Sequence, residues 1–324
     1  MNHYVIPNTD LSVSRLAYGT MRLGSGWSDE ARGADARALS RSLVEAALEH
    51  GVNHLDLADI YNRGDSDKAV GYALKENPGL RDKLVLQEKV GILVGSDPAH
   101  GEPSRYDYSY EHLITAVEGC LKRLGTDRVD LLAFHRPDIL VEPEEVARAA
   151  QHLHREGMVR YFGVSNHSPL QIELLKRYLD VPLVVNQLQL SLLHHGLISA
   201  GITLNQSAAH YTNTQETLEY CRLNGVMVQA WSPVAGGALF TPAEDAPEHV
   251  RKAAALLSTL AADKDVPAEA VALAWLLRHP AGIQPIVGTT KLERLAASVK
   301  ADEVELSRPE WYSLLAAARG AGVP

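Results

Sequence analysis

The sequence contains few cysteines and few aromatic residues, and it lacks a long apolar stretch. Cys120 and Cys221 are its 2 cysteines, and aromatic residues make up 6% of the 324 residues. Each cysteine lies in a helical pattern, which predicts a small core thiol. No apolar run reaches the roughly 18 residues of a membrane span, and the start, MNHYVIPNTD, lacks the basic and apolar regions of a signal peptide. We therefore expect a cytoplasmic protein.

Positive charge is also scarce. The chain has 31 basic and 40 acidic residues, a formal net charge of −9, which disfavours binding to nucleic acid and to anionic membranes. No linker or low-complexity tract divides it, and 46% hydrophobic residues are enough for a large core. We expect residues 1–324 to form a single domain, and the sequence indicates no particular oligomeric state.

Two common nucleotide-binding motifs are absent. No G-x-G-x-x-G follows an apolar run, and no G-x-x-x-x-G-K-[ST] occurs, which disfavours a doubly wound sheet. Instead, helical stretches that end on a glycine alternate with short apolar runs. Strands are predicted at about 16–20, 53–57, 84–88, 129–134, 159–164, 183–187, 226–230 and 284–287. Eight such units predict a (β/α)8 TIM barrel with its active site at the carboxyl ends of the strands.

Short sequence motifs predict an N-terminal hairpin, a helix start and a C-terminal helix. YVIP and LSVS around residues 8–10 predict an N-terminal β-hairpin that covers the bottom of the barrel. Ser168-Pro169-Leu170-Gln171 has the pattern of a helix start with a capping box. Ser307-Arg308-Pro309-Glu310 repeats that pattern and predicts a C-terminal helix.

Polar or aromatic residues stand at or just past the ends of six predicted strands. They are Asp56, Lys89, His135, Ser165 with Asn166, Gln187 and Trp231. Because the carboxyl ends of parallel strands meet on one face of a barrel, we expect these side chains to lie close together.

The motifs around these residues resemble those of aldo-keto reductases, most closely the bacterial branch of predicted oxidoreductases. They are DLADIY (56–61), QEKVG, LLAFHRPD, GVSNHSP, VVNQLQLSLLH, VQAWSPVAGGALF and PIVGTTKLERL. The resemblance extends along essentially the whole chain. It implies a barrel oxidoreductase that reduces an aldehyde or ketone substrate to an alcohol with a nicotinamide cofactor.

The resemblance assigns catalytic roles that carbonyl chemistry supports. Tyr61 is the expected acid for the carbonyl oxygen, and the Lys89 ammonium is expected to lower the pKa of its phenol. Asp56 would keep Lys89 charged, and His135 would orient the carbonyl. Taken singly, each residue also fits a purely structural role. Tyr61 could pack on the rim of the barrel and Asp56 could be a loop carboxylate. Lys89 could be a surface lysine, and His135 could be a histidine of the core.

The expected cofactor is NADP(H), in preference to NAD(H). Trp231, where the family usually has tyrosine or phenylalanine, offers a stacking face, and amide and hydroxyl groups can bind the carboxamide. The predicted cofactor residues are Thr20, Met21, Ser165, Asn166, Gln187, Trp231, Ser232, Pro233, Val234, Gly236, Gly237, Leu239, Gly288, Thr289, Thr290, Lys291, Arg294 and Ser298. Lys291 and Arg294 suit a 2′-phosphate, or else form a solvated basic face.

Substrate contacts are expected from Trp27, Tyr106, Tyr108 and Arg136, and no metal site is predicted. Arg136 could meet an acidic group of the substrate or could pair with Asp138. Two other classes of protein stay open. One is a nicotinamide-binding redox sensor without catalysis, and the other is a metal-dependent barrel hydrolase that uses Asp56, Asp59, His54 and His135.

Overall fold

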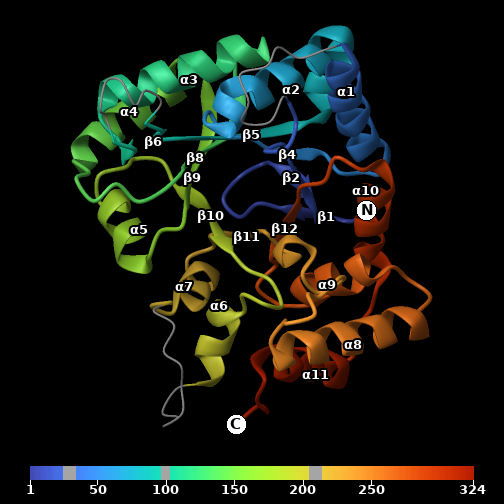
Figure 1. The fold of residues 1–324 in the computed structure, drawn as a ribbon. Coiled ribbons are helices and arrows are strands. Elements are labelled where there is room, and N and C mark those ends of the chain that lie inside the picture. Colours follow the sequence, from blue (N-terminus) through green and yellow to red (C-terminus); the bar gives the residue numbers. More distant parts are fainter. Residues whose placement is uncertain (25–33, 96–102, 204–213) are drawn as a thin grey trace.

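The protein is seen in a computed structural model that describes residues 1–24, 34–95, 103–203 and 214–324. Its centre is a closed barrel of parallel strands (Figure 1). In order around the barrel the strands are β3 (Ala17–Gly19), β4 (His54–Asp56), β5 (Val85–Val90), β8 (Val129–Phe134), β9 (Val159–Ser165), β10 (Leu183–Gln189), β11 (Met227–Trp231) and β12 (Gln284–Val287). The predicted TIM barrel is confirmed. Strands 129–134 and 284–287 have the predicted bounds, and the others differ by one or two residues at an end.

Helices surround the barrel (Figure 1). They are α1 (Ala34–Glu49), α2 (Asp65–Glu76), α3 (Tyr110–Leu124), α4 (Pro143–Arg155), α5 (Pro169–Lys176), α6 (Gly196–Ser199), α7 (Thr217–Leu223), α8 (Glu248–Asp263), α9 (Ala268–Leu277), α10 (Leu292–Val299) and α11 (Arg308–Arg319). Short 3-10 turns occupy Tyr61–Gly64, Pro78–Lys83, Ala200–Ile202, Ala235–Gly237 and Lys300–Glu303. Within the described ranges no helix has the length and apolar character needed to cross a membrane.

The predicted capping signals are present at the helix starts. Ser168 and Ser307 each form a capping box, with Gln171 and Glu310 as the reciprocal partners. The Ser109 side chain accepts a hydrogen bond from the backbone of His112 at the start of α3, whose buried face packs on the barrel. These caps satisfy backbone groups that a helix leaves unpaired at its start.

The predicted hairpin closes the lower end of the barrel. β1 (His3–Val5) pairs with β2 (Ser12–Ser14), and Ile6, Leu11 and Val13 pack against residues near the amino ends of the barrel strands. Those barrel residues are Val85, Leu131, Val184, Val185 and Met227. A second small hairpin, β6 (Ile92–Leu93) with β7 (Arg105–Tyr106), follows β5.

The side chains inside the barrel form layers, because every second residue of a strand faces inward. Above the apolar layer at the hairpin, Gln87, Gln229 and Gln284 form a buried chain of hydrogen bonds of 2.8–2.9 Å. Gln284 donates in turn to the Ser14 carbonyl at 2.7 Å. The glutamine layer thus connects the hairpin to the polar layer above, where Asp56 and Lys89 lie.

Gly71 permits the close packing of α2 against α3. A Cβ at this position would lie 2.4 Å from the Arg123 carbonyl oxygen and 2.9 Å from that of Leu124. Backbone atoms cannot move aside as a flexible side chain can, so Gly71→Ala should lower stability by about 1–3 kcal/mol. Thermal unfolding measures the effect. Gly79→Ala is the control, because its Cβ would approach nothing closer than Asn77 Oδ1 at 3.7 Å. Equal melting temperatures for the two variants would contradict this account of the α2–α3 contact.

Candidate active site

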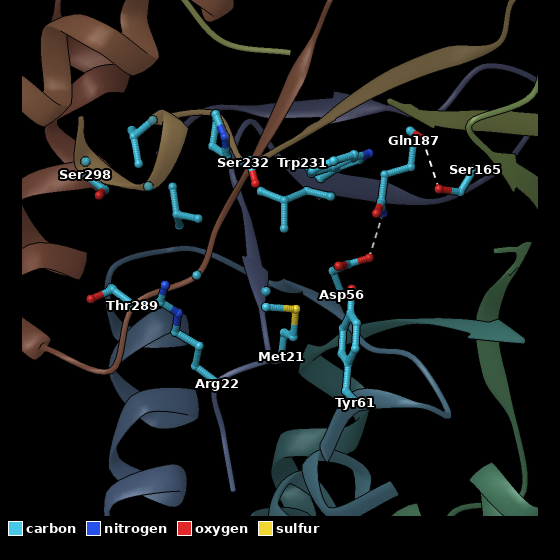
Figure 2. A pocket seen from close by; sticks show the side chains of 18 of the residues that line it. Met21, Arg22, Asp56, Tyr61, Ser165, Gln187, Trp231, Ser232, Thr289 and Ser298 are labelled. Carbon is cyan, nitrogen blue, oxygen red and sulfur yellow. Dashed lines mark hydrogen bonds between the residues drawn. The ribbon is translucent and has the colours of Figure 1, made fainter. Parts of the chain in front are cut away.

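A cavity of about 420 Å³ opens at the carboxyl ends of the strands. Figure 2 shows side chains from several strand ends directed into it, with Asp56 and Tyr61 on one side and Trp231 and Ser232 on another. Asp56, Tyr61 and His135 line the cavity, whereas Lys89 is fully buried directly beneath it. The structure therefore brings together the four residues that the sequence predicts as catalytic.

A buried ion pair joins two neighbouring strands below the cavity. Lys89 Nζ donates to Asp56 Oδ1 at 2.6 Å and to the Leu57 carbonyl oxygen at 2.5 Å. Burial alone would lower the pKa of Lys89, but the Asp56 carboxylate and the Tyr61 phenol outweigh it and raise this pKa to about 12. Lys89 is thus a fixed ammonium ion at neutral pH.

Tyr61 lies above that ammonium ion. Its ring centroid is 4.9 Å from Lys89 Nζ and 6.1 Å from the centroid of the His135 ring. Burial raises the pKa of Tyr61 to about 12, and the nearby Lys89 offsets only part of this rise. The pKa of Tyr61 is therefore raised, whereas Lys89 alone was expected to lower it. Burial disfavours the phenolate more strongly than the Lys89 ammonium ion stabilises it.

His135 is neutral in this site. Burial is the main cause that holds its pKa well below the usual range, and the charges of Lys89 and Arg136 act in the same direction. Its Nδ1 has no hydrogen-bond partner among the described residues. A neutral imidazole can donate one hydrogen bond and so orient a carbonyl oxygen, but it brings no proton of its own as an imidazolium ion would.

Gln187 links the ion pair to the wall of the cavity. Its Nε2 donates to Asp56 Oδ1 at 2.7 Å (dashed in Figure 2), and Gln87 Nε2 donates to the same oxygen at 3.1 Å. Because the Gln187 amide nitrogen is used in this way, its Oε1 is the atom left to accept a hydrogen bond from a ligand.

Trp231, Asn166 and Ser165 form one connected wall. Trp231 Nε1 donates to Asn166 Oδ1 at 3.1 Å, and Asn166 Nδ2 donates to Ser165 Oγ at 2.7 Å. Ser165 Oγ donates to the Gln187 carbonyl oxygen at 3.0 Å (Figure 2). These bonds fix the indole plane, so that a flat ring can stack on it without reordering the wall.

The remaining predicted cofactor residues divide into two groups. Those that line the cavity are Met21, Ser232, Pro233, Val234, Gly236, Gly237, Gly288, Thr289, Arg294 and Ser298. Those that do not are Thr20, which is buried and donates to the Asp56 carbonyl oxygen at 3.0 Å, Leu239, Thr290 and Lys291. Left-handed backbone at Ser232, Ala235, Gly236 and Gly237 curves the segment after β11 around the cavity.

Of the predicted substrate residues that the structure describes, one lines the cavity and two do not. Trp27 lies outside the described residues, and Tyr106 and Tyr108 are not among the residues that line the cavity. Tyr106 is partly exposed, whereas Tyr108 is buried and its hydroxyl donates to the Arg136 carbonyl oxygen. Arg136 does line the cavity, with its guanidinium 5.7 Å from the Trp231 ring centroid.

Several lining residues were not named among the predicted site residues. They are Gly19, Arg22, Ile60, Ile92, Phe240, Glu269, Ile286 and Val287. Arg22 and Ile92 belong to the loops after β3 and β5, which the sequence predicts to border the substrate, and Phe240 directly follows the predicted cofactor segment. Glu269 lies in α9, and no periodic pattern marks it as a cavity residue.

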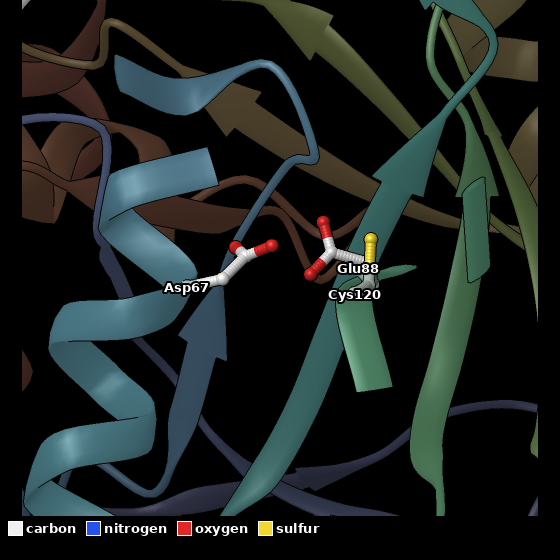
Figure 3. A group of neighbouring side chains, drawn as sticks. All are labelled: Asp67, Glu88 and Cys120. Atoms are coloured by element: carbon white, nitrogen blue, oxygen red, sulfur yellow. The ribbon is translucent and has the colours of Figure 1, made fainter. Parts of the chain in front are cut away.

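A buried polar cluster lies behind β5. Asp67 of α2, Glu88 of β5 and Cys120 of α3 each offer one oxygen or sulfur atom that could bind a metal ion, and these atoms lie within 4.8 Å of one another (Figure 3). Glu88 accepts from the Lys89 amide at 2.9 Å, and Arg123 pairs with Asp67 at 2.9 Å. Burial raises the pKa of Asp67 to about 6 and that of Glu88 well above its usual range. Asp67 Oδ1 and Glu88 Oε2 have no hydrogen-bond partner among the described residues.

This cluster bears on the hydrolase hypothesis. Among the described residues it is the sole group of three or more potential metal ligands, and it includes none of Asp56, Asp59, His54 and His135. Those four residues do not converge on one point, and Asp56 is already bound by Lys89. Cys120 and Cys221 are both buried free thiols, as the sequence predicted.

The fold and the site define the class of protein first. A closed parallel barrel with a tyrosine, a buried lysine–aspartate pair and a histidine at its carboxyl face is the arrangement that the sequence predicts for a barrel oxidoreductase. The model of the aldo/keto reductase family matches residues 15–318. The chain belongs to the aldo/keto reductase family.

Individual relatives agree with this assignment. An uncharacterised oxidoreductase, YcsN, of Bacillus subtilis (strain 168) is 38% identical over 318 residues, which is 97% of each chain. A 6-dehydroglucose reductase of Agrobacterium fabrum is 36% identical over 311 residues, 96% of each chain. Among solved structures, the glycerol dehydrogenase from Gluconobacter oxydans has a TM-score of 0.82 at 25% identity and covers 97% of this chain and 95% of its own.

The ion pair makes a prediction about stability and pH. Asp56→Asn leaves the Lys89 ammonium buried without its counter-charge, which should cost about 3–5 kcal/mol at pH 7. In the native protein the raised pKa of Lys89 gives a stabilisation that is complete below its ordinary value of 10.5 and is lost as pH rises through about 12. In the variant burial lowers this pKa instead, so the stability deficit should narrow as pH rises from 7 to about 9.5.

Chemical denaturation of both proteins across this pH range tests the claim. Asp127→Asn is the control, since Asp127 is exposed and its contact with Arg128 is 3.5 Å. That variant should change stability by about 0.5 kcal/mol or less at any pH. A deficit in Asp56→Asn that stays constant with pH would mean that Lys89 is not the group responsible.

Proposed function

We propose that the protein reduces an aldehyde or ketone to an alcohol with NADPH. The observation that carries the proposal is the position of Tyr61, a protonated phenol above the Lys89–Asp56 pair and beside neutral His135, at the wall of the cavity. Tyr61 and His135 can then both donate hydrogen bonds to one carbonyl oxygen.

Tyr61 supplies the proton in this scheme. As negative charge develops on the carbonyl oxygen, Tyr61 transfers its phenolic proton and becomes a phenolate. The Lys89 ammonium ion stabilises that phenolate, and Asp56 holds Lys89 in place and charged. His135 orients the oxygen without changing its own protonation state at neutral pH.

The cavity wall fits a dinucleotide with a nicotinamide end, and this group supplies the hydride when bound. Trp231 offers a fixed flat face, and Gln187 Oε1 together with Ser165 and Asn166 offers partners for a carboxamide. No atom lies within 4 Å of a Cβ built on Gly236, so the backbone after β11 leaves room for a close approach by phosphate.

Arg294 supports the preference for NADPH over NADH. It is exposed in the first turn of α10 and lines the cavity together with Ser298 of the same helix. A guanidinium at a helix start suits a phosphate monoester better than a ribose hydroxyl. Lys291 precedes this helix and does not line the cavity, so Arg294 carries the greater part of the proposed selectivity.

The substrate class that we favour is a polyhydroxylated carbonyl compound. Relatives in Agrobacterium fabrum and Novosphingobium aromaticivorans are named 6-dehydroglucose reductases, at 36% and 34% identity. Polar lining groups such as Arg22, Glu269 and Asn166 in the first cavity are compatible with a sugar-like molecule.

Tyr61→Phe tests the proton path. The variant should bind NADPH as the native protein does and should lose at least about 100-fold in kcat for carbonyl reduction, because no other positioned acid replaces the phenol. Loss of nicotinamide absorbance with an activated aromatic aldehyde measures turnover, and fluorescence titration measures binding. Tyr178→Phe, on the outside of the barrel, is the control. Should the native protein bind NADPH yet reduce no member of a broad carbonyl panel, a sensor role would replace this proposal.

Arg294→Ala tests the cofactor preference. Loss of a charge-assisted contact to a phosphate should raise the dissociation constant of NADPH about 10- to 100-fold and leave that of NADH nearly unchanged. Arg308→Ala, an exposed arginine at the start of another helix, is the matched control. Equal affinities of the native protein for the two cofactors, or an unchanged NADPH affinity in Arg294→Ala, would contradict the preference.

A further inference from the structure

A second cavity of about 570 Å³ adjoins the first. The two share Arg136, Asn166 and Trp231, and the second extends from this shared wall toward α5 and α6. A ligand that reaches Arg136 from the first cavity is therefore at the boundary of the second.

Arg136 is placed to bind an anion at that boundary. It directly follows His135, and its backbone is fixed by the Tyr108 hydroxyl, which donates to its carbonyl oxygen. The Asp138 carboxylate accepts instead from the backbone amides of Tyr108 at 3.1 Å and Leu140 at 2.9 Å. In the described part of the chain no ion pair holds the Arg136 guanidinium, which lies over the Trp231 ring.

The described residues that line the second cavity carry no negative charge. Among these described residues there is no aspartate or glutamate, and Arg136 is the sole arginine or lysine. Gln171, Gln189 and Ser168 contribute neutral polar groups. Burial lowers the pKa of His194 and of His195, so both imidazoles are neutral at pH 7. One guanidinium among neutral hydrogen-bonding groups suits a single acidic group attached to a hydroxylated chain.

We propose that the substrate carries an acidic group besides its carbonyl, that Arg136 binds this group, and that the rest of the molecule extends into the second cavity. The inference rests on the proposed function and refines it, since Tyr61 and His135 receive the carbonyl while Arg136 selects among carbonyl compounds. Arg136 is in this view a residue that determines specificity.

The charge requirement is tested with 4-carboxybenzaldehyde and its neutral amide, 4-formylbenzamide, at saturating NADPH. The native protein should have the higher kcat/KM for the acid. Arg136→Met keeps a long apolar stem but removes the charge, and it should lower the acid-to-amide ratio of kcat/KM about 10- to 100-fold, mainly through KM. Arg136→Lys should restore part of the ratio, because an ammonium keeps the charge without the planar fork.

Arg177→Met is the matched control for this series. Arg177 is an exposed arginine at the end of α5, outside both cavities, and its loss should leave the acid-to-amide ratio as it is. A ratio near one in the native protein, or a ratio that Arg136→Met does not change, would overturn the inference while carbonyl reduction itself stands. If neither aldehyde is reduced, the proposed function fails first and this inference fails with it.

The role of the second cavity is tested with N-(4-formylbenzoyl)glycine and N-(4-formylbenzoyl)serine, which share the aldehyde and its distance to the carboxylate and differ in a hydroxymethyl branch beside the acid. The native protein should have the higher kcat/KM for the serine compound. Leu193→Trp places a large ring at a residue that lines the second cavity and does not line the first, and it should abolish this advantage. A native preference for the glycine compound, or a preference for the serine compound that Leu193→Trp retains, would exclude the second cavity as the site of the branch.

Discussion

The buried ion pair of Lys89 and Asp56 is the constraint on which the rest of the site depends. Two charges in a barrel interior are stable only when their other hydrogen-bonding capacity is also satisfied. Here the Leu57 carbonyl and the amides of Gln87 and Gln187 complete the pair, and they come from the residue after β4, from β5 and from β10. The strands must therefore keep their observed register, because a shift of one residue would turn these side chains out of the interior.

The same requirement explains the polar layer inside an otherwise apolar barrel. The glutamines below the ion pair extend its hydrogen bonds to the backbone of the N-terminal hairpin. On the outer side of β5, Glu88 accepts from the Lys89 amide and faces Asp67. Lys89 is thus held through its side chain from within the barrel and through its backbone from outside it.

Much of this arrangement could be predicted from the sequence, because it follows from periodic patterns. Short apolar runs between helices gave the strands and their order, and the residues that end those runs gave Asp56, Lys89, His135 and Trp231. Positions in loops were harder to predict. Tyr108 was expected at the substrate site but packs in the core, because its contacts come from the Phe134 and His167 rings, which are remote in sequence.

Pairings across the barrel were also beyond sequence reasoning. Nothing in the pattern around Gln229 indicates that it meets Gln87, which is 142 residues away. The net rise in the pKa of Tyr61 was missed for the same reason, since the degree of burial is a property of the whole site rather than of a motif. Local chemistry predicts which groups can take part in the site, whereas tertiary packing decides which of them meet and how strongly water is excluded from them.

The hairpin at the lower end of the barrel restricts how molecules enter and leave the first cavity. Among the described residues, Ile6, Leu11 and Val13 fill the interior there, on the side of the barrel away from the first cavity. A molecule in the cavity therefore does not leave through the lower end of the barrel, and it departs on the carboxyl side, where its successor also enters. Release of one molecule and arrival of the next thus compete for the same side of the barrel.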